Sequence, residues 1–317
     1  MGEFIKIGLA LGGGGARGLA HLGVLCALEK EKIPIALIAG TSMGAMVAGS
    51  YALAPRCDLL VDRFRRYLES KPFQRTNPEF LYEHTEDLPK YQGIFHRFAT
   101  LVKKGFFYSQ SLTKRAAISQ EIFAQNINFL IDDVKIEQAQ IPLAIVALDL
   151  QSAQEVVLRS GSLRQAVSAS CAIPGILPPV EIDGRELVDG GWINRVPVSP
   201  LRAMGADLTI AVDVAETAED IEDLQTGIGI VMRTNEICRC ALSRLQMEEA
   251  DVVIRPDVSR IHWADFRRLD ECLEFGEKAM REKMGDLRRM THRKQVKKIL
   301  RLPFRFLSPK SPRRNDP

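Results

Sequence analysis

Residues 38–46 read IAGTSMGAM and contain the pattern Gly40-x-Ser42-x-Gly44. A short apolar run precedes this pattern, and an alanine- and glycine-rich segment that predicts a helix follows it. A serine between two glycines at a strand-to-helix turn is typical of a nucleophile, because side chains at the flanking positions would clash. At a helix N-terminus, backbone N–H groups and the helix dipole also favour negative charge. We therefore expect Ser42 to be a catalytic nucleophile.

A glycine-rich loop, residues 12–18 with the sequence GGGGARG, directly follows the first predicted strand. It contains GxGxxG, but a dinucleotide site would need an acidic residue at the end of the second strand, where Ala39 and Gly40 stand instead. No Gly-Lys-Ser/Thr follows, which excludes a Walker loop. We interpret the loop as an oxyanion hole built from free N–H groups. The candidate donors and substrate contacts are Gly13, Gly14, Gly15, Arg17 and Met43.

Arg17 has two interpretations at this stage. Its guanidinium is able to bind a phosphate-bearing substrate, or it holds the loop by hydrogen bonds. We favour the second interpretation.

The base that would activate Ser42 is not obvious from the sequence. The chain has five histidines, at positions 21, 84, 96, 262 and 292. An α/β-hydrolase places its nucleophile after several strands, whereas only one strand and one helix precede the elbow strand here. Asp189, in Val188-Asp189-Gly190-Gly191, is the other candidate, since a carboxylate held beside the serine is able to accept its proton. From these residues alone, a turn aspartate is the simpler interpretation.

Four sequence blocks, in this order and spacing, resemble the patatin-like phospholipases, and in particular the compact bacterial members related to neuropathy target esterase. The blocks are residues 13–18 (GGGARG), 40–44 (GTSMG), 169–179 (ASCAIPGILPP) and 189–191 (DGG), the last continued by GGWINRVPV at 190–198. The resemblance covers residues 5–215. It implies a Ser–Asp dyad without histidine, in which Ser42 is the nucleophile and Asp189 the base. It also implies an oxyanion hole at Gly13–Gly15, with Gly18, Gly40, Gly44, Gly190 and Gly191 as supporting motif residues.

The alternation of strand and helix patterns predicts an α/β protein with a mostly parallel central sheet. With the resemblance, we expect a patatin-like three-layer α/β/α domain over 5–215, carrying a helical insertion at about 56–110 that either walls a site or forms a plain helical layer. A mostly helical part over 216–292 should pack on this domain, and a basic, mobile tail should follow over 293–317. Predicted strands cover 4–11, 35–39, 141–150, 155–159, 208–214 and 252–255, a hairpin covers 180–188, and helices cover 18–30, 43–54, 111–125, 162–170, 220–250 and 265–291.

Composition places few further limits on function. The 317 residues, 46% hydrophobic and 26% charged, fit a globular enzyme without a bilayer-spanning segment or a signal peptide. Six cysteines lack a CxxC pair and nearby histidines, so we expect no metal site and six reduced thiols. We accordingly predict a cytoplasmic location, with contact to the inner membrane surface as an extension of that prediction.

Positive charge gathers at the end of the chain. Residues 286–317 hold eleven Lys and Arg against two Asp, a local charge of +9 in a chain whose net charge is +3. Apolar residues alternate with these cations over 293–307, as on a segment that lies on an anionic membrane. A basic helix packed on the body explains the pattern equally well, and both interpretations remain open. A nucleic-acid partner is disfavoured, because no binding fold accompanies the basic run.

The function expected from these patterns is hydrolysis of carboxylic esters of phospholipids or lysophospholipids, without cofactor or metal. A thioesterase or transacylase would use the same dyad. A phosphate- or nucleotide-binding regulatory module without hydrolytic activity is the alternative from another class. The substrate is a lipid or acyl ester, and the oligomeric state is not determined by these patterns.

Overall fold

The computed structural model describes residues 5–76, 115–116, 118–215, 224 and 227–301, and these residues form an eight-stranded sheet. The strands follow the order β5-β6-β3-β2-β1-β7-β8, with β4 paired to β3. β1, β2, β3, β7 and β8 run parallel, whereas β4 and β6 are antiparallel to β3 and β5 is antiparallel to β6. The bounds are β1 Ile7–Leu11, β2 Leu37–Thr41, β3 Leu143–Asp149, β4 Gln154–Leu158, β5 Val180–Ile182, β6 Arg185–Asp189, β7 Leu208–Val212 and β8 Val252–Ile254. The predicted α/β class with a mostly parallel sheet is confirmed.

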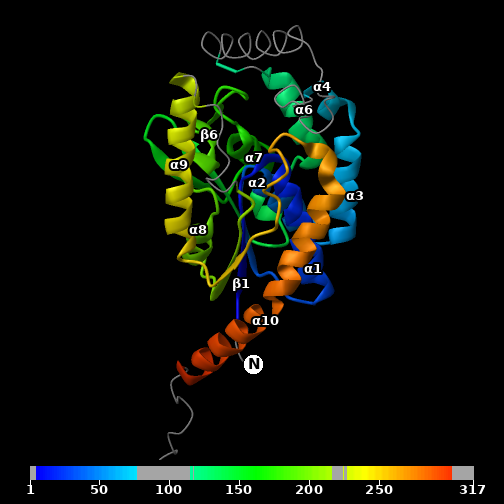
Figure 1. Cartoon of the computed structure of the whole chain (residues 1–317), viewed down its shortest axis with the longest axis vertical. Coiled ribbons are helices and arrows are strands. Elements are labelled where there is room, and N and C mark those ends of the chain that lie inside the picture. Colours follow the sequence, from blue (N-terminus) through cyan, green and yellow to red (C-terminus); the bar gives the residue numbers. More distant parts are fainter. Residues whose placement is uncertain (1–4, 77–114, 117, 216–223, 225–226, 302–317) are drawn as a thin grey trace, which may run out of the picture.

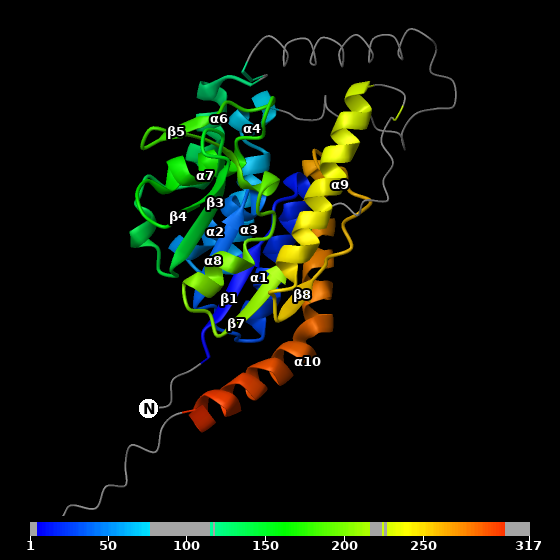
Figure 2. The ribbon, with the colours of Figure 1, turned by 90° about the vertical axis from the view of Figure 1, so that its left-hand side faces the viewer.

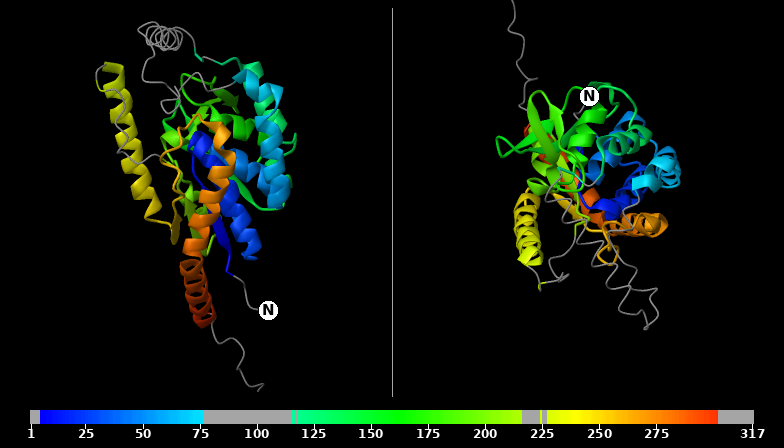
Figure 3. Two further views of the ribbon diagram at one scale, coloured as in Figure 1. Left: turned by 45° about the vertical axis from the view of Figure 1, so that its right-hand side comes forward. Right: turned by 90° about the horizontal axis from the view of Figure 1, so that it is seen from above.

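Helices cover both faces of the sheet (Figures 1 and 2). One layer contains α1 (Ala20–Lys30), α2 (Met43–Leu53), α3 (Cys57–Leu68), α4 (Lys71–Thr76), α6 (Gln120–Leu130), α7 (Leu163–Cys171) and α10 (Leu269–Arg301). The other contains α8 (Val198–Ala203) and α9 (Gly227–Met247). Short 3₁₀ turns lie at Gly15–Leu19, Ile136–Gln138, Gly190–Trp192 and Phe266–Arg268. Figure 3 shows α3 and α9 on opposite sides of the molecule.

The alternation of side-chain size along the strands explains the two unequal layers. In β1, Leu9 and Leu11 join the large core beneath α1, α2 and α10, whereas Ala10 joins a smaller core with Ala39 and Leu201. Successive side chains of a strand point to opposite faces, so one face carries large residues and the other carries alanines. The small residues let α8 lie close to the sheet.

Most predicted elements are present, with ends that differ by a few residues. The hairpin at 180–188 forms β5 and β6, which pair antiparallel. The helix predicted over 111–125 falls partly on residues 111–114 and 117, which lie outside the described residues, and its limits are wrong in the described part, where α6 begins at Gln120 and ends at Leu130. Ser119 caps this helix, its hydroxyl oxygen accepting the N–H of Ile122 at 3.4 Å. Such a cap satisfies an N–H group that has no partner inside the helix, which starts α6 later than the apolar pattern predicted.

The start of the expected insertion packs as ordinary core. Phe64 is fully buried in α3 and Tyr67 nearly so, and the Tyr67 ring meets that of Phe73 edge-on at 5.1 Å. These aromatics therefore form a helical layer on the sheet. The remaining part of the insertion, residues 77–110, lies outside the described residues, and so do His84 and His96.

Cys26 and Cys57 form a disulfide with their Cα atoms 5.3 Å apart. The expectation of six reduced thiols is therefore wrong for this pair, which links α1 to the first residue of α3. The sequence did not reveal the bond because the two positions meet only once both helices lie on the sheet. Cys171, Cys240 and Cys272 form no disulfide and are buried, as small apolar side chains commonly are. Cysteine usage thus no longer supports the predicted cytoplasmic location.

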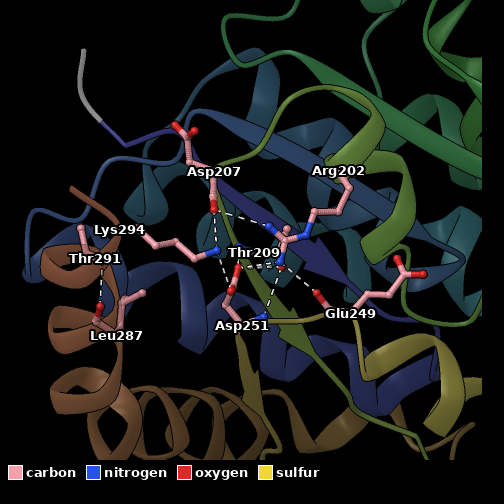
Figure 4. A network of polar contacts seen from close by, with 8 residues as sticks. All are labelled: Arg202, Asp207, Thr209, Glu249, Asp251, Leu287, Thr291 and Lys294. Atoms are coloured by element: carbon pink, nitrogen blue, oxygen red, sulfur yellow. Dashed lines mark hydrogen bonds and ion pairs between the residues drawn. The ribbon is translucent and has the colours of Figure 1, made fainter. Parts of the chain in front are cut away.

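The helix α10 continues to Arg301, so the first nine residues of the expected tail are helical. Lys294 pairs with Asp251 at 2.6 Å, and Lys298 pairs with Asp207 at 3.0 Å. Figure 4 shows how Lys294, Arg202 and the Thr209 backbone surround Asp251 at the amino ends of β7 and β8. This segment therefore follows the packed-helix interpretation, while residues 302–317 lie outside the described part. No helix within the described ranges is long and apolar enough to cross a membrane.

Candidate active site

Two strands meet end to end along one edge of β3. β4 pairs with residues 145–149 of β3 and occupies one edge, while β2 pairs with residues 143–146 and β6 with residues 147–149. Because both ranges overlap with that of β4, β2 and β6 must share the other edge. They approach from opposite directions, with Thr41 opposite Val146 and Asp189 opposite Ala147. Ser42, the residue after β2, is thereby brought to Asp189, the last residue of β6.

Ser42 has the strained backbone of a nucleophile elbow. Its φ of 55° and ψ of −123° lie in a region that L-residues rarely adopt, and α2 begins at the next residue. A methyl group at Gly44 would clash with the carbonyl oxygen of Leu11, which explains the glycine at that position. The elbow predicted from residues 40–44 is therefore present, with Ser42 9% exposed.

Hydrogen bonds from the last residues of α7 hold the elbow in place. The hydroxyl oxygen of Ser170 accepts the Ser42 N–H at 2.9 Å and donates its own proton to the Val146 carbonyl at 2.6 Å. The Cys171 thiol donates to the Ser42 carbonyl at 3.3 Å. The motif block at 169–179 was recognised in the sequence, but these two roles were not. No local pattern indicates that α7 lies beneath the elbow.

Asp189 is buried, 5% exposed, and its carboxylate accepts the Gly191 N–H at 2.7 Å. Ser42 lies beside it, and the serine hydroxyl lowers the pKa of the carboxyl. Burial raises this pKa and outweighs the opposing effects of Ser42, the Gly191 N–H and the nearby Arg239 and Arg195. A carboxylate with a raised pKa is a stronger base. The chain after Asp189 can lie this close to β3 because Gly190 has no side chain; a Cβ atom there would clash with the Val146 carbonyl.

The glycine loop lies beside the elbow, and its N–H groups differ in whether they already have a hydrogen-bond partner. The N–H of Gly13 is already used, because it donates to the Arg195 carbonyl at 3.0 Å. The expectation that Gly13 donates to an oxyanion is therefore not met in this structure. The N–H groups of Gly14, Gly15 and Met43 make no hydrogen bond to any part of the chain that the structure describes. These three N–H groups are the candidate oxyanion donors that remain without a partner in the described structure.

Arg17 and His21 fix the loop from behind. The buried Arg17 donates its Nε–H to the Ile261 carbonyl at 2.5 Å. His21 lies 2.7 Å from the Gly12 carbonyl through Nε2, and burial lowers its pKa to about 4. His21 is therefore neutral at pH 7, with Nε2 carrying the proton that Gly12 accepts. These contacts agree with the supporting role that we favoured for Arg17.

The family model described as Patatin-like phospholipase matches residues 9–202, more than half of the chain. The chain belongs to the patatin-like phospholipase family. This match spans the glycine loop, the elbow and the Asp189 corner, so the resemblance inferred from the four sequence blocks is confirmed.

Several relatives of this patatin-like chain carry names. An uncharacterized NTE family protein of Mycobacterium tuberculosis is 35% identical over 209 residues, 66% of this chain and 49% of that protein. Lysophospholipase NTE1 of Pyricularia oryzae is 27% identical over 310 residues, 89% of this chain and 19% of that protein. A solved structure of human GIVD cytosolic phospholipase A2 superposes with a TM-score of 0.49 at 12% identity, over 93% of this chain and 60% of that one. The chain thus spans about half the length of its mycobacterial relative.

An ionic network missed in the sequence adjoins the patatin-like site. Glu236 of α9 pairs with Arg195 at 2.8 Å and with Arg239 at 3.2 Å. Arg239 also donates to the Gly191 carbonyl at 3.3 Å and covers the Trp192 ring at 4.4 Å from its centroid. The family match ends before α9, so motif comparison had no means of finding Glu236 or Arg239. Their spacing of three residues on a predicted helix was the only available signal.

Proposed function

We propose that the chain hydrolyses carboxylic esters of phospholipids or lysophospholipids, with Ser42 as the nucleophile and Asp189 as the base. The observation that carries the proposal is the position of Ser42, directly after β2, beside the buried Asp189 carboxylate at the end of β6, where the serine hydroxyl lowers the pKa of the carboxyl. The family supports a lipid substrate, and one relative has the name lysophospholipase.

In the first step Asp189 takes the hydroxyl proton while Oγ of Ser42 attacks the acyl carbon. The carbonyl oxygen becomes an oxyanion, which the N–H groups of Gly14, Gly15 and Met43 are available to stabilise. One such donor is typically worth about 10²–10³ in rate. The carbon–oxygen bond to the leaving alcohol then breaks, and Asp189 returns its proton to that alcohol. An acyl-Ser42 ester remains.

In the second step water attacks the acyl-enzyme. Asp189 accepts a proton from the water, the oxyanion forms again, and the bond to Ser42 breaks. The proton passes from Asp189 to Oγ of Ser42, so the dyad is restored and a fatty acid leaves. Each proton removed is returned, which is why no further group is required.

A histidine is not needed for this cycle. In the described ranges no hydrogen bond joins a histidine to Ser42 or Asp189. His21 lies nearby in the sequence, but its Nε2 is bound to the Gly12 carbonyl. The raised pKa of Asp189 supports a carboxylate in the role that histidine has in other serine hydrolases.

The proposal is tested with a short-chain ester and the folded variants Ser42→Ala and Asp189→Asn. Both should lose at least about 10³-fold in kcat/KM, because the dyad acts as a unit. Matched controls are Ser50→Ala, a buried serine further along α2, and Asp149→Asn, a buried aspartate that caps a turn after β3. These controls should remain active. Full activity in either dyad variant would exclude the mechanism.

The substrate class needs a second experiment. A panel of phospholipids, lysophospholipids and acyl thioesters, with Ser42→Ala as the inactive control, separates the lipid hydrolase from a thioesterase. Addition of an acceptor alcohol shows whether acyl transfer competes with hydrolysis. An organophosphonate should label Ser42 in the wild type. Absence of labelling together with absence of turnover would favour a regulatory binding module.

We also propose peripheral membrane contact through the end of α10. One side of this helix exposes Arg293, Val296, Lys297 and Leu300, which combine cations with apolar groups at helical spacing. Truncation would remove Lys294 and Lys298, which hold the helix, so point variants are the better test. Arg293→Glu with Lys297→Glu should reduce sedimentation with anionic liposomes, while Lys283→Glu, an exposed lysine earlier in α10, should not. Equal sedimentation of all three proteins would contradict the contact.

A further inference from the structure

The inward side of α9 contacts the loop that follows Asp189. Arg239 donates to the carbonyl of Gly191, and the N–H of the same glycine donates to the Asp189 carboxylate at 2.7 Å. The guanidinium is also stacked on Trp192, the next residue. The arginine therefore holds the middle and the last residue of the short 3₁₀ turn Gly190–Trp192, whose backbone orients the carboxylate. Its side chain is only 24% exposed, so its contacts are poorly screened by solvent.

Glu236 holds two arginines that belong to different parts of the site. It pairs with Arg239 at the Asp189 corner and with Arg195, whose carbonyl accepts the Gly13 N–H. Gly13 in turn lies directly beside the Cβ atom of Ser42. A single carboxylate on α9 thus connects the base and the glycine loop through short ion pairs and backbone hydrogen bonds.

We propose that Arg239, held by Glu236, is a positioning residue that orients the Asp189–Gly191 turn and stabilises the carboxylate form of Asp189. Because Asp189 acts as a base only under the proposed function, the inference rests on that function. Arg239 and Glu236 lie outside the region that the family model matches, which ends at residue 202. Arg239 and Glu236 touch neither the substrate nor the reacting atoms in this role.

The charges that face Asp189 give the sign of the expected pH effect. The Ser42 hydroxyl comes from the elbow, the Cys171 thiol from α7, Arg195 from the segment after β6, and Arg239 from α9. Both arginines lower the pKa of Asp189, and Glu236 holds both of them through ion pairs. A carboxylate base works above its pKa, so activity falls on the acid side. Loss of Arg239 should raise that pKa, and loss of the Glu236 charge, which releases Arg239, should raise it by a smaller amount.

The test is the pH profile of kcat/KM for a short-chain ester. Arg239→Ala should move the acid limb to higher pH, so its loss relative to the wild type grows as the pH falls. Glu236→Gln should move the limb in the same direction by a smaller amount, because Arg239 is no longer held, and Arg239→Lys, which keeps the positive charge, should leave the limb closer to its wild-type position. Arg244→Ala, an exposed arginine on the same helix, is the matched control and should leave the limb unchanged. Thermal unfolding of each variant identifies any that do not fold.

A purely structural role would lower the plateau of both variants without moving the acid limb, and that result would overturn the proposal. A second readout does not need activity. In ¹³C-aspartate-labelled protein, the carboxyl signal that Asp189→Asn removes should titrate at higher pH in Arg239→Ala and Arg239→Met than in the wild type. An unchanged titration overturns the positioning role even if the ester is hydrolysed. An inactive wild type with a shifted titration contradicts the hydrolase alone.

Discussion

Carboxylates at the two ends of the sheet have opposite environments. At the amino ends of β7 and β8, burial by itself raises the pKa of Asp251, but Lys294, the Thr209 N–H and Arg202 outweigh it and the pKa is lowered. At the carboxyl end of β6, burial outweighs the surrounding hydrogen bonds and charges, and the pKa of Asp189 is raised. Both groups are surrounded by cations, but only Asp251 forms direct ion pairs with them.

The comparison shows that one fold contains a carboxylate that stabilises the structure and another whose environment suits it to act as a base. Ion pairs neutralise Asp251 and leave it little tendency to take a proton, so it stabilises the junction of the sheet with α10. Asp189 is instead desolvated and held by weaker contacts, so its negative charge is less stable and its basicity is higher. Function is therefore expected where the carboxylate is destabilised, at some expense of stability.

The largest expected effect separates activity from stability at Asp189. Asp189→Asn should lose at least about 10³-fold in kcat/KM and yet have an equal or higher Tm, because an amide removes a buried charge. Enzyme assay and thermal unfolding at pH 7 measure the two quantities. A marked fall in Tm would show that the carboxylate is structural and that the two ends of the sheet do not differ in this respect.

The converse variant is Asp251→Asn. It should lower the free energy of unfolding by about 2 kcal/mol, because Lys294 and Arg202 lose the carboxylate that neutralises them. Activity per folded molecule should remain close to that of the wild type. Urea unfolding with a parallel ester assay provides both values. An unchanged stability would mean that solvent replaces the ion pairs without cost.

The acid dependence of stability should follow the amino-end carboxylates. The folded-state pKa values of Asp251 and Asp207 are both lowered. For Asp207, burial is the largest single effect and raises the pKa, but the contacts with Lys6 and Lys298 together outweigh it. The stabilisation by both carboxylates is present above the unfolded pKa of about 4 and is lost as the pH falls through the folded values. Unfolding free energies below pH 4 should therefore drop in the wild type and drop less in Asp251→Asn. Parallel curves for the two proteins would contradict the assignment.

The smallest effect is expected at Lys298. Its pair with Asp207 is partly exposed, so Lys298→Ala should cost less than about 1 kcal/mol. Salt should weaken the difference between the variant and the wild type, because exposed ion pairs are screened. Urea unfolding at low and high ionic strength measures both. A cost as large as that of Asp251→Asn would show that the two lysines anchor α10 equally.

Local patterns were sufficient where a feature depends on adjacent residues. The glycines around Ser42, the loop after β1 and the Asp189-Gly190-Gly191 turn each follow from backbone sterics within a few positions. Strand alternation and apolar helix faces likewise predicted the sheet and most helices. The α6 limits failed because the cap at Ser119 is a single hydroxyl contact, which the apolar pattern does not show.

The sequence by itself therefore predicted the candidate nucleophile and determined the family and the α/β class, because each has a short-range signature, while the candidate base followed from the family resemblance. Only the tertiary structure decided that β2 and β6 meet along β3, that Gly13 donates to Arg195 and that Arg239 reaches Gly191 from α9. It also decided the Cys26–Cys57 bond and the lysine contacts of α10. These contacts join residues far apart in the chain, and their geometry arises only when the sheet and its helices pack together.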